Sequence, residues 1–342
     1  MTYFSGFSVP FLLKLSLISI SLQVPTSLQF PQENPIITDF DVSAQTRITR
    51  GDDHGSDVEW CYQNATCGET TWPSTCLTGK AQSPINFPPL EKTTCTIKNF
   101  PRTSYNSQKF SLESNGKSLV IKLLDKTKQQ RIHFQWQEQN ASYNFNSIHM
   151  HWGGNNSVGS EHSIDSKRFA IEMHLIHVRA DFKTLPDALS FGKKNALAVL
   201  GILFEVDPNL KEKQNENLQP IVKNIHEITH SGVVKNLEEK LNLQAFMKGN
   251  HAYHYMGSLT TPSCNEAVAW LVWQKPIKIS SLDLDALRTV KNTMGEPLMN
   301  NFRSTQKTNE RKITLCEIKA GKVKDNVGNK PTQEELMAHS KL

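Results

Sequence analysis

Two segments of this chain resemble strands, with two histidines on one face of the first and a third on one face of the second, and this pattern constrains the fold more than any other feature. His149 and His151 are separated by one residue, and His174 lies in the alternating run 171–178. Residues i and i+2 of a strand point to the same side, so Met150 faces away from its two neighbours. If the two strands lie side by side, the sequence predicts a sheet in which three imidazoles meet.

The three imidazoles favour a catalytic zinc ion. Three neutral histidines leave a tetrahedral Zn²⁺ with one open position, whereas a structural zinc ion takes four protein ligands. A single histidine on a strand is more often a hydrogen-bonded core residue, but three at this spacing favour a metal. The faces of the second run carry Ile171, Met173 and Leu175 on one side and Glu172, His174 and Ile176 on the other. We therefore predict Zn²⁺ as the cofactor, with the three histidines as its ligands.

The residues around these histidines resemble the α-class carbonic anhydrases. The motifs that carry the resemblance are His-Met-His-Trp-Gly at 149–153, Gly-Ser-Glu-His at 159–162, Glu-Met-His-Leu-Ile-His at 172–177 and Gly-Ser-Leu-Thr-Thr-Pro at 257–262. Supporting matches are Trp60, Gln-Ser-Pro-Ile-Asn at 82–86 and Asn-Asn-Phe-Arg at 300–303. The matches follow the family's order over residues 58–318, which is far more than one short motif supplies.

The resemblance implies a fold and an activity. The fold is a single domain of mainly β (α+β) class, built on a large twisted, mostly antiparallel central sheet with short peripheral helices. The activity is reversible hydration of carbon dioxide to bicarbonate and a proton, with inhibition by sulfonamides and small anions. Bound zinc would lower the pKa of water to about 7, a value known for carbonic anhydrases themselves and not obtained from this sequence. Alternating stretches predict strands at 118–123, 171–178, 196–206 and 267–273.

The resemblance also implies roles for residues beside the zinc ligands. Thr260 would accept a hydrogen bond from the hydroxide and donate its own proton to Glu161, while Glu172 would orient the imidazole of His174. The family's glutamine partner of the first histidine is Ser147 here, so a shorter hydroxyl or a water would hold His149 with some loss of zinc affinity. Substrate-binding residues match at Ile176, Val199, Leu259, Thr261, Val268 and Trp270.

Lys117 stands where the fast members of the family carry a histidine that shuttles protons. An imidazole with a pKa near 6.5 accepts a proton from a group of pKa about 7, whereas a lysine with a pKa near 10.4 is almost wholly protonated. We therefore expect proton export to limit turnover and the activity to be moderate. His133 has no assigned role and is a second candidate carrier.

A rival zinc motif lies on a predicted helix at 218–230. His226-Glu227-Ile228-Thr229-His230 matches the His-Glu-x-x-His motif of metalloproteases. The apolar stripe of this helix contains Leu218, Ile221, Val222, Ile225 and Ile228, and Gly232 would end it. His226 and His230 fall beside the stripe on the polar face, where a buried metal site would not lie. We expect a solvated helix face and no protease.

The ends of the chain indicate secretion. Residues 11–22 are mostly apolar and carry one charge, Lys14, which predicts a signal peptide at 1–22, although a buried core helix is the alternative. A polar, proline-containing connector follows at 23–57, and the tail at 319–342 reads as disordered. Neither contains an apolar span, so we expect no transmembrane segment. The terminal Ser340-Lys341-Leu342 matches a peroxisomal address, which we discount because a secreted chain does not meet its receptor.

Six cysteines fit an oxidising compartment, although six allow 15 pairings from the sequence alone. The resemblance implies three pairs, Cys76–Cys264, Cys61–Cys67 and Cys95–Cys316, with free thiols as the alternative. Asn64, Asn140 and Asn155 begin glycosylation sequons, which carry meaning only in a secreted chain.

The remaining alternatives concern partners. The net charge of +5 comes from lysines scattered among acidic residues, so we expect a solvated surface and no nucleic-acid partner.

A secreted binding or matrix protein with a carbonic anhydrase fold and little turnover is the rival function. Inactive relatives characteristically lack a zinc histidine, and here all three are present together with Thr260 and Glu161.

Overall fold

The computed structural model describes residues 60–62, 64–125, 133–136, 139–211, 213–228 and 230–321. The predicted signal peptide at 1–22, the connector at 23–57 and residues 322–342 of the predicted tail lie outside them. Within these ranges, no helix is both long enough and apolar enough to cross a membrane.

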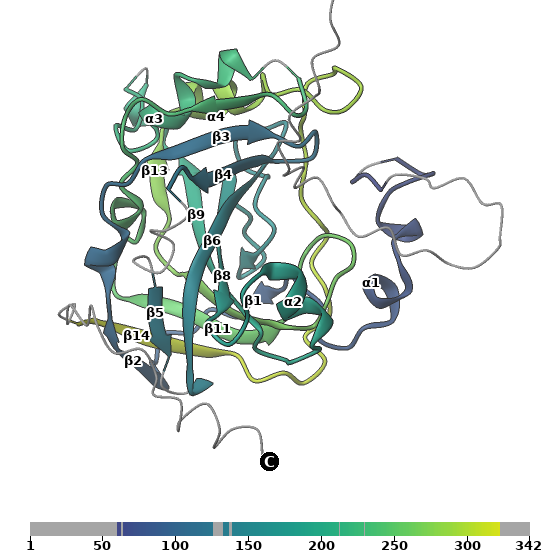
Figure 1. Ribbon diagram of the computed structural model, residues 1–342, viewed down its shortest axis with the longest axis vertical. Coiled ribbons are helices and arrows are strands. Elements are labelled where there is room, and N and C mark those ends of the chain that lie inside the picture. Colours follow the sequence, from purple (N-terminus) through teal and green to yellow (C-terminus); the bar gives the residue numbers. More distant parts are fainter. Residues whose placement is uncertain are drawn as a thin grey trace, which may run out of the picture. The chain divides into compact units, whose positions relative to one another are not determined.

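A mixed sheet of twelve strands dominates the described part of the chain (Figure 1), with a separate two-stranded sheet formed by β1 and β7. The main path runs β10-β3-β4-β6-β8-β9-β12-β11-β14-β2, with β5 beside β6 and β13 beside β9. Most neighbours are antiparallel, and the β9–β12, β9–β13 and β14–β2 pairs are parallel. The predicted mainly β class with short peripheral helices is confirmed. The strands are β1 Asn86–Phe87, β2 Cys95–Phe100, β3 Phe110–Ser114, β4 Leu119–Leu123, β5 His133–Trp136, β6 Ala141–Trp152, β7 Ser163–Ile164, β8 Ile171–Arg179, β9 Leu197–Val206, β10 Val234–Asn236, β11 His251–Gly257, β12 Val268–Trp273, β13 Ile277–Ile279 and β14 Thr314–Ala320.

The described helices are short. The α-helices are α1 Ser74–Thr78, α2 Leu185–Ser190, α3 Gln219–Val222 and α4 Ser281–Leu287, and 3-10 turns cover Glu69–Thr71, Arg102–Tyr105, Pro208–Leu210, Ile225–Glu227 and Leu243–Phe246. The single helix predicted at 218–230 is wrong, because α3 ends at Val222 and only a 3-10 turn follows. The side chain of Asn224 donates to the Pro220 carbonyl at 2.9 Å, an alternative to helical bonding that short polar residues offer the backbone. The predicted apolar stripe is nevertheless buried.

The two faces of the sheet pack against separate apolar clusters. Ile148, Met150 and Trp152 of β6 belong to the larger cluster, together with alternate residues of β8. Ile176 and Val178 of β8 belong to the second cluster, on the face that also carries His174. All nine residues of β8 are buried. The polar site is therefore built into a strand that has apolar packing on both sides.

Three disulfides pair all cysteines of the described chain. Cys95 and Cys316 lie opposite one another on the parallel strands β2 and β14. Cys76 at α1 is joined to Cys264, 188 residues away, and Cys61 to Cys67, six residues away. These are the pairs that the family resemblance implied.

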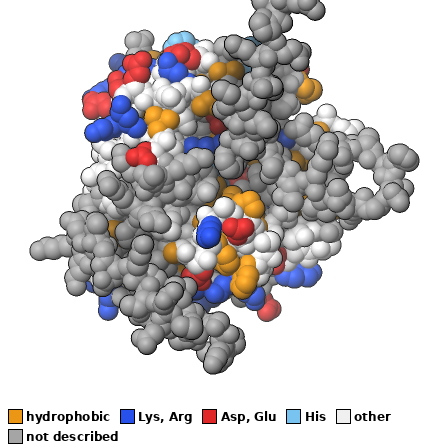
Figure 2. Space-filling view, in the orientation of Figure 1, with side chains coloured by type: hydrophobic (Ala, Val, Ile, Leu, Met, Phe, Trp, Pro, Cys, Tyr) orange, Lys and Arg blue, Asp and Glu red, His pale blue; other side chains and the backbone are white. Residues whose placement is uncertain are grey.

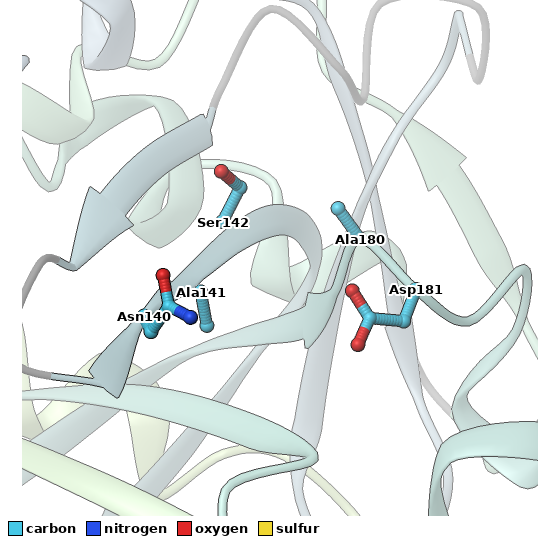
Figure 3. Close-up of a pocket in the computed structure, with 5 residues that line it drawn as sticks. All are labelled: Asn140, Ala141, Ser142, Ala180 and Asp181. Carbon is cyan, nitrogen blue, oxygen red and sulfur yellow. The ribbon is translucent and has the colours of Figure 1, made fainter. Parts of the chain in front are cut away.

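The surface carries both signs of charge. Basic and acidic side chains are intermingled on the face shown in Figure 2, as the scattered lysines of the sequence predict. A hollow of about 330 Å³ is lined by Asn140, Ala141, Ser142, Ala180 and Asp181 (Figure 3). It lies at the start of β6, whereas His149 and His151 lie near the other end of that strand.

We predict that the long-range disulfides stabilise the fold more than the short one does. The entropy lost by the unfolded chain gives about 5 kcal/mol for the 221-residue Cys95–Cys316 loop and about 2 kcal/mol for the six-residue Cys61–Cys67 loop. Urea unfolding of Cys95→Ala/Cys316→Ala should therefore show the larger loss, with Cys61→Ala/Cys67→Ala as the matched control. Equal losses in the two double variants would contradict the prediction.

Candidate active site

The pairing of β6 with β8 brings the predicted histidines to neighbouring positions. His149 lies directly opposite His174, and His151 lies opposite Glu172. The Nε2 atom of His151 approaches Nδ1 of His174 to 3.1 Å, and both imidazoles are buried. The adjacency that the alternating pattern required is therefore present.

One ring nitrogen of His151 and one of His174 each contact a hydrogen-bond acceptor outside the pair. Nδ1 of His151 lies 2.8 Å from the carbonyl oxygen of Asn301, which can only accept, so Nδ1 carries the proton. Nε2 of His174 lies 2.8 Å from Oε1 of Glu172, whose pKa is held well below its usual range. Burial lowers the pKa of His151 to about 3, with His174 adding to the effect, so this ring is neutral at pH 7. The unprotonated Nε2 of His151 therefore faces inward.

Glu161 adds an acceptor to the same point. Its Oε2 lies 3.5 Å from Nε2 of His151 and 3.8 Å from Nδ1 of His174, and among the described residues this buried atom has no hydrogen-bond partner. Ligand atoms of His151, Glu161 and His174 all lie within 4.8 Å of one another. Two imidazole nitrogens and a carboxylate oxygen placed in this way could hold a metal ion, and zinc takes ligands of both kinds.

His149 lies beside this group without joining it. It is half-buried, and its pKa is lowered to about 3, first by burial and then by His151 and His174. It belongs to neither compact group of potential ligand atoms in the described chain. Ser147, the residue in the place of the family's glutamine, is buried and donates its hydroxyl to Oδ1 of Asn146 at 3.0 Å. The structure shows no hydrogen bond from Ser147 to His149 within the described residues.

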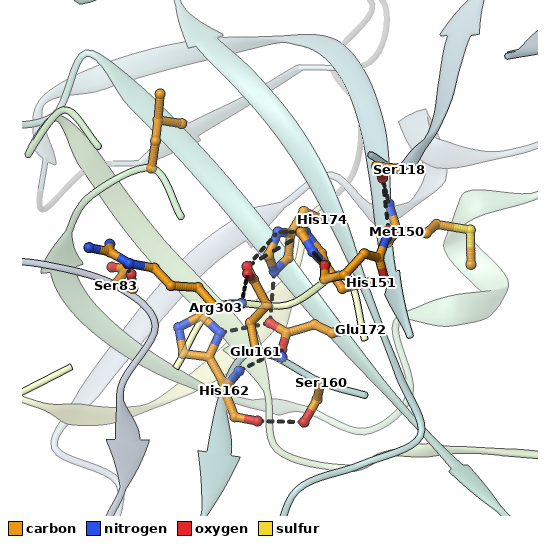
Figure 4. A network of polar contacts seen from close by, with 12 residues as sticks. Ser83, Ser118, Met150, His151, Ser160, Glu161, His162, Glu172, His174 and Arg303 are labelled. Carbon is orange, nitrogen blue, oxygen red and sulfur yellow. Dashed lines mark hydrogen bonds and ion pairs between the residues drawn. The ribbon is translucent and has the colours of Figure 1, made fainter. Parts of the chain in front are cut away.

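Glu172 anchors the polar side of the site (Figure 4). Its Oε1 contacts Nε2 of His174 at 2.8 Å and Nδ1 of His162 at 2.7 Å, and its Oε2 accepts the N–H groups of Glu161 and His162. Burial alone would raise the pKa of Glu172, but His162, His174 and these hydrogen bonds outweigh it. The chain of contacts continues from Nε2 of His162 to the Tyr255 hydroxyl at 2.7 Å.

Glu161 is held from two other segments. Its Oε1 accepts the N–H of Arg303 at 2.9 Å, and a side-chain hydrogen bond from Thr260 lowers its pKa. Burial has the larger, opposite effect, so the pKa of Glu161 is raised overall. Thr260 therefore lies close enough to Glu161 to act on the pKa of its carboxyl group.

An apolar wall borders the imidazoles. The ring of Trp270 packs edge-on against His174, with a centroid separation of 4.8 Å. The other apolar residues of the predicted wall lie in the same cluster, with Ile176, Val199 and Val268 buried and Leu259 packed against them, and Thr261 lies beside Thr260 half-buried. The site thus has an apolar side next to its polar centre.

Lys117 lies in the turn before β4. Its ammonium is 4.7 Å from the centre of the Trp60 ring, a cation–π contact. Its backbone carbonyl accepts from Nδ2 of Asn301 at 3.0 Å, the residue whose carbonyl holds His151. His133 is the first residue of β5, and its side chain lies outside the described part of the structure.

The rival protease motif does not form a metal site in the described residues. His226 lies in the 3-10 turn Ile225–Glu227, and His226 and His230 are both exposed. With the helix interrupted, the i, i+4 geometry that His-Glu-x-x-His requires is lost. Glu227 forms an ion pair with Lys235 at 2.7 Å.

Comparison with known proteins decides the family. Residues 67–317 match the model of the eukaryotic-type carbonic anhydrases. The chain is 32% identical over 267 residues to putative carbonic anhydrase 5 of Caenorhabditis elegans, covering 76% of this chain and 82% of the relative. It is 30% identical over 273 residues to human carbonic anhydrase 12, covering 75% and 72%, and 28% identical over 272 residues to mouse carbonic anhydrase 15, covering 75% and 82%. The chain belongs to the eukaryotic-type carbonic anhydrase family. It is therefore a carbonate dehydratase.

Several residues of this carbonic anhydrase site were not assigned roles from the sequence. Three of them contact the site directly: His162 through Glu172, Asn301 through His151 and Arg303 through Glu161. The fourth, Tyr255, contacts His162. His162, Asn301 and Arg303 belong to the matching motifs at 159–162 and 300–303. A motif match does not show which hydrogen bonds its residues form.

We predict that Glu172→Gln destabilises the metal-free protein in a pH-dependent way. Its lowered folded pKa means that the carboxylate adds stability above its unfolded pKa and loses it as pH falls through the folded value. Loss of charge-assisted hydrogen bonds should cost about 1.5–3 kcal/mol at pH 7, and the difference from wild type should shrink below about pH 4.5.

Urea unfolding of the metal-free protein at pH 7 and pH 4 measures the Glu172→Gln effect. Glu205→Gln is the control, because its carboxylate also has a lowered pKa but pairs with exposed lysines. This control should cost less than about 1 kcal/mol. A Glu172 effect that stays the same at both pH values would contradict the assignment.

Proposed function

We propose that this chain catalyses zinc-dependent reversible hydration of carbon dioxide, with His149, His151 and His174 as the zinc ligands. The observation that supports the proposal is the convergence of His151, His174 and Glu161, whose potential ligand atoms lie within 4.8 Å of one another. His149 supplies the third imidazole, since it faces His174 across the strand pair. Zinc, when bound, supplies a Lewis acid that makes water acidic enough to react at neutral pH.

The residues of the chain orient the reactants. Thr260 has one hydroxyl proton, and donating it to Glu161 leaves only acceptor positions on Oγ. An O–H group at the reacting centre would then donate its hydrogen bond to Oγ of Thr260, and this bond would fix its direction. Carbon dioxide is small and apolar, so the wall of Ile176, Val199, Leu259, Val268 and Trp270 receives it beside the polar centre, with Thr261 at the polar margin.

Glu172 and Ser147 differ in what they do for the metal ligands. Glu172 fixes the ring and tautomer of His174 through the 2.8 Å contact, and this partner raises the basicity of the imidazole. Ser147 supports His149 less than a longer amide side chain would, since its hydroxyl is bonded to Asn146. We propose that the zinc affinity is therefore lower than it would be with a glutamine at position 147.

Lys117 makes proton export the slow step. The Lys117 side chain lies over the Trp60 ring, and an ammonium group has no lone pair with which to accept a proton. The catalytic proton must leave by buffer or by another carrier.

We further propose that the protein is secreted, with a signal peptide at 1–22, a connector at 23–57, an enzymatic domain at 58–318 and a tail at 319–342. The three disulfides support an oxidising compartment. Asn64, Asn140 and Asn155 are exposed, as N-glycosylation requires. Sulfonamides and small anions are the inhibitor classes expected of a site of this kind, and the intact Thr260–Glu161 pair argues against a binding protein without turnover.

Stopped-flow hydration of carbon dioxide tests the proposed function. We expect activity that a zinc chelator and a sulfonamide abolish, and His149→Ala should reduce kcat/KM at least about 100-fold because a ligand is lost. His226→Ala, in the rival motif, is the control and should leave the rate unchanged. Retained hydration in His149→Ala, or proteolysis that disappears in His226→Ala, would overturn the proposal.

Replacing Lys117 tests the proton step. We expect Lys117→His, or added imidazole, to raise kcat several-fold in weak buffer and leave kcat/KM nearly unchanged, because an imidazole with a pKa near 6.5 both accepts and releases protons. Lys122→His, an exposed position on β4, is the control. If neither the Lys117 variant nor imidazole changes kcat, another residue carries the proton.

A further inference from the structure

Arg168 follows a tight turn that folds back onto the segment carrying Glu161. Asp165 and Ser166 both have positive φ, 49° and 63°, and the backbones of Ile164 and Lys167 bond each other on either side of them. Two central residues with positive φ are typical of a type I′ hairpin turn. The turn brings residues 167–169 back alongside residues 160–164.

The base of this hairpin is also bonded. The N–H of Ser160 donates to the carbonyl of Phe169 at 2.8 Å, and the N–H of Phe169 donates to Oγ of Ser160 at 2.9 Å. The backbone at Arg168 is therefore held close to the segment that carries Glu161, while Lys167 is exposed and forms an ion pair with Glu205. Two adjacent cations thus have different surroundings, one at the site and one at the surface.

Arg168 contacts both segments that position Glu161. Its guanidinium donates to the carbonyl of Ser160, the residue before Glu161. Its Cζ lies 4.9 Å from the centre of the Phe302 ring, and Phe302 immediately precedes Arg303. Burial lowers the pKa of Arg168, and the carboxylates of Glu161, Glu172 and Glu69 oppose this effect.

The second of these segments holds the Glu161 carboxylate directly. The N–H of Arg303 donates to Oε1 of Glu161 at 2.9 Å. The Arg303 side chain is itself fixed, donating to Oε1 of Gln82 at 2.9 Å and to the carbonyl of Ser83 at 2.7 Å. Arg168 therefore connects the backbone that carries Glu161 with the backbone that bonds its carboxylate.

We propose that Arg168 is a positioning residue that fixes Glu161 relative to Thr260, by bonding the Ser160 carbonyl and packing on Phe302 at the same time. The inference rests on the proposed function, because it assigns Arg168 a part in aligning the reactants through Glu161. Arginine suits both tasks, since its planar guanidinium donates within its plane and packs through its face. A lysine ammonium keeps the charge but is a point donor without a face.

The test compares Arg168→Met and Arg168→Lys with Lys167→Met in the zinc-loaded full-length protein. We expect Arg168→Met to lower kcat/KM about tenfold through misplacement of Glu161. In weak buffer kcat should change less than about twofold, because proton export limits it. Arg168→Lys should remain at least about threefold below wild type in kcat/KM, and Lys167→Met should match wild type.

Amide hydrogen exchange gives a readout that does not depend on turnover. The N–H of Arg303 should exchange at least about tenfold faster in Arg168→Met than in wild type, because its acceptor has moved, and Lys167→Met should show no change. Full kcat/KM in Arg168→Met, unchanged exchange at Arg303, or an equal fall in kcat and kcat/KM would each overturn the inference. An inactive wild type would instead reject the proposed function, and the exchange measurement would still decide whether Arg168 holds this segment.

Discussion

The antiparallel register of β6 and β8 is the constraint on which the site depends. It sets His149 opposite His174 and His151 opposite Glu172, so every other polar contact begins from positions that this pairing has fixed. A slip of one residue would turn the histidines toward the larger apolar cluster and Met150 toward the polar centre. Because both faces of β8 are buried, apolar packing on one side and hydrogen bonding on the other specify the same register.

Placing a carboxylate in such a strand requires full hydrogen bonding. Both Glu172 oxygens have two nitrogen neighbours each, from two imidazoles and two backbone N–H groups. An ionised carboxylate without them would be costly in the core, and with them it joins β8 to the segment of Glu161 and, through His162 and Tyr255, to β11. The same contacts that stabilise the buried charge therefore orient the ring of His174.

The sequence predicted the parts of this protein that depend on local pattern. Alternation identified the strands at 118–123, 171–178, 196–206 and 267–273, which correspond to β4, β8, β9 and β12. The predicted helix at 218–230 is wrong. The periodic pattern predicted burial correctly, but it does not show that the Asn224 side chain bonds the Pro220 carbonyl where the helix ends. Asn301 and Arg303 could not be assigned roles, because their contacts with His151 and Glu161 join residues 150 and 142 positions apart.

These long-range contacts separate two properties of position 117. The backbone carbonyl of Lys117 accepts from Asn301, whose own carbonyl holds His151, so the turn at 117 is coupled to the geometry of the imidazoles. The Lys117 side chain takes no part in that bond and instead lies over Trp60. The main-chain support of His151 therefore does not depend on which side chain stands at position 117.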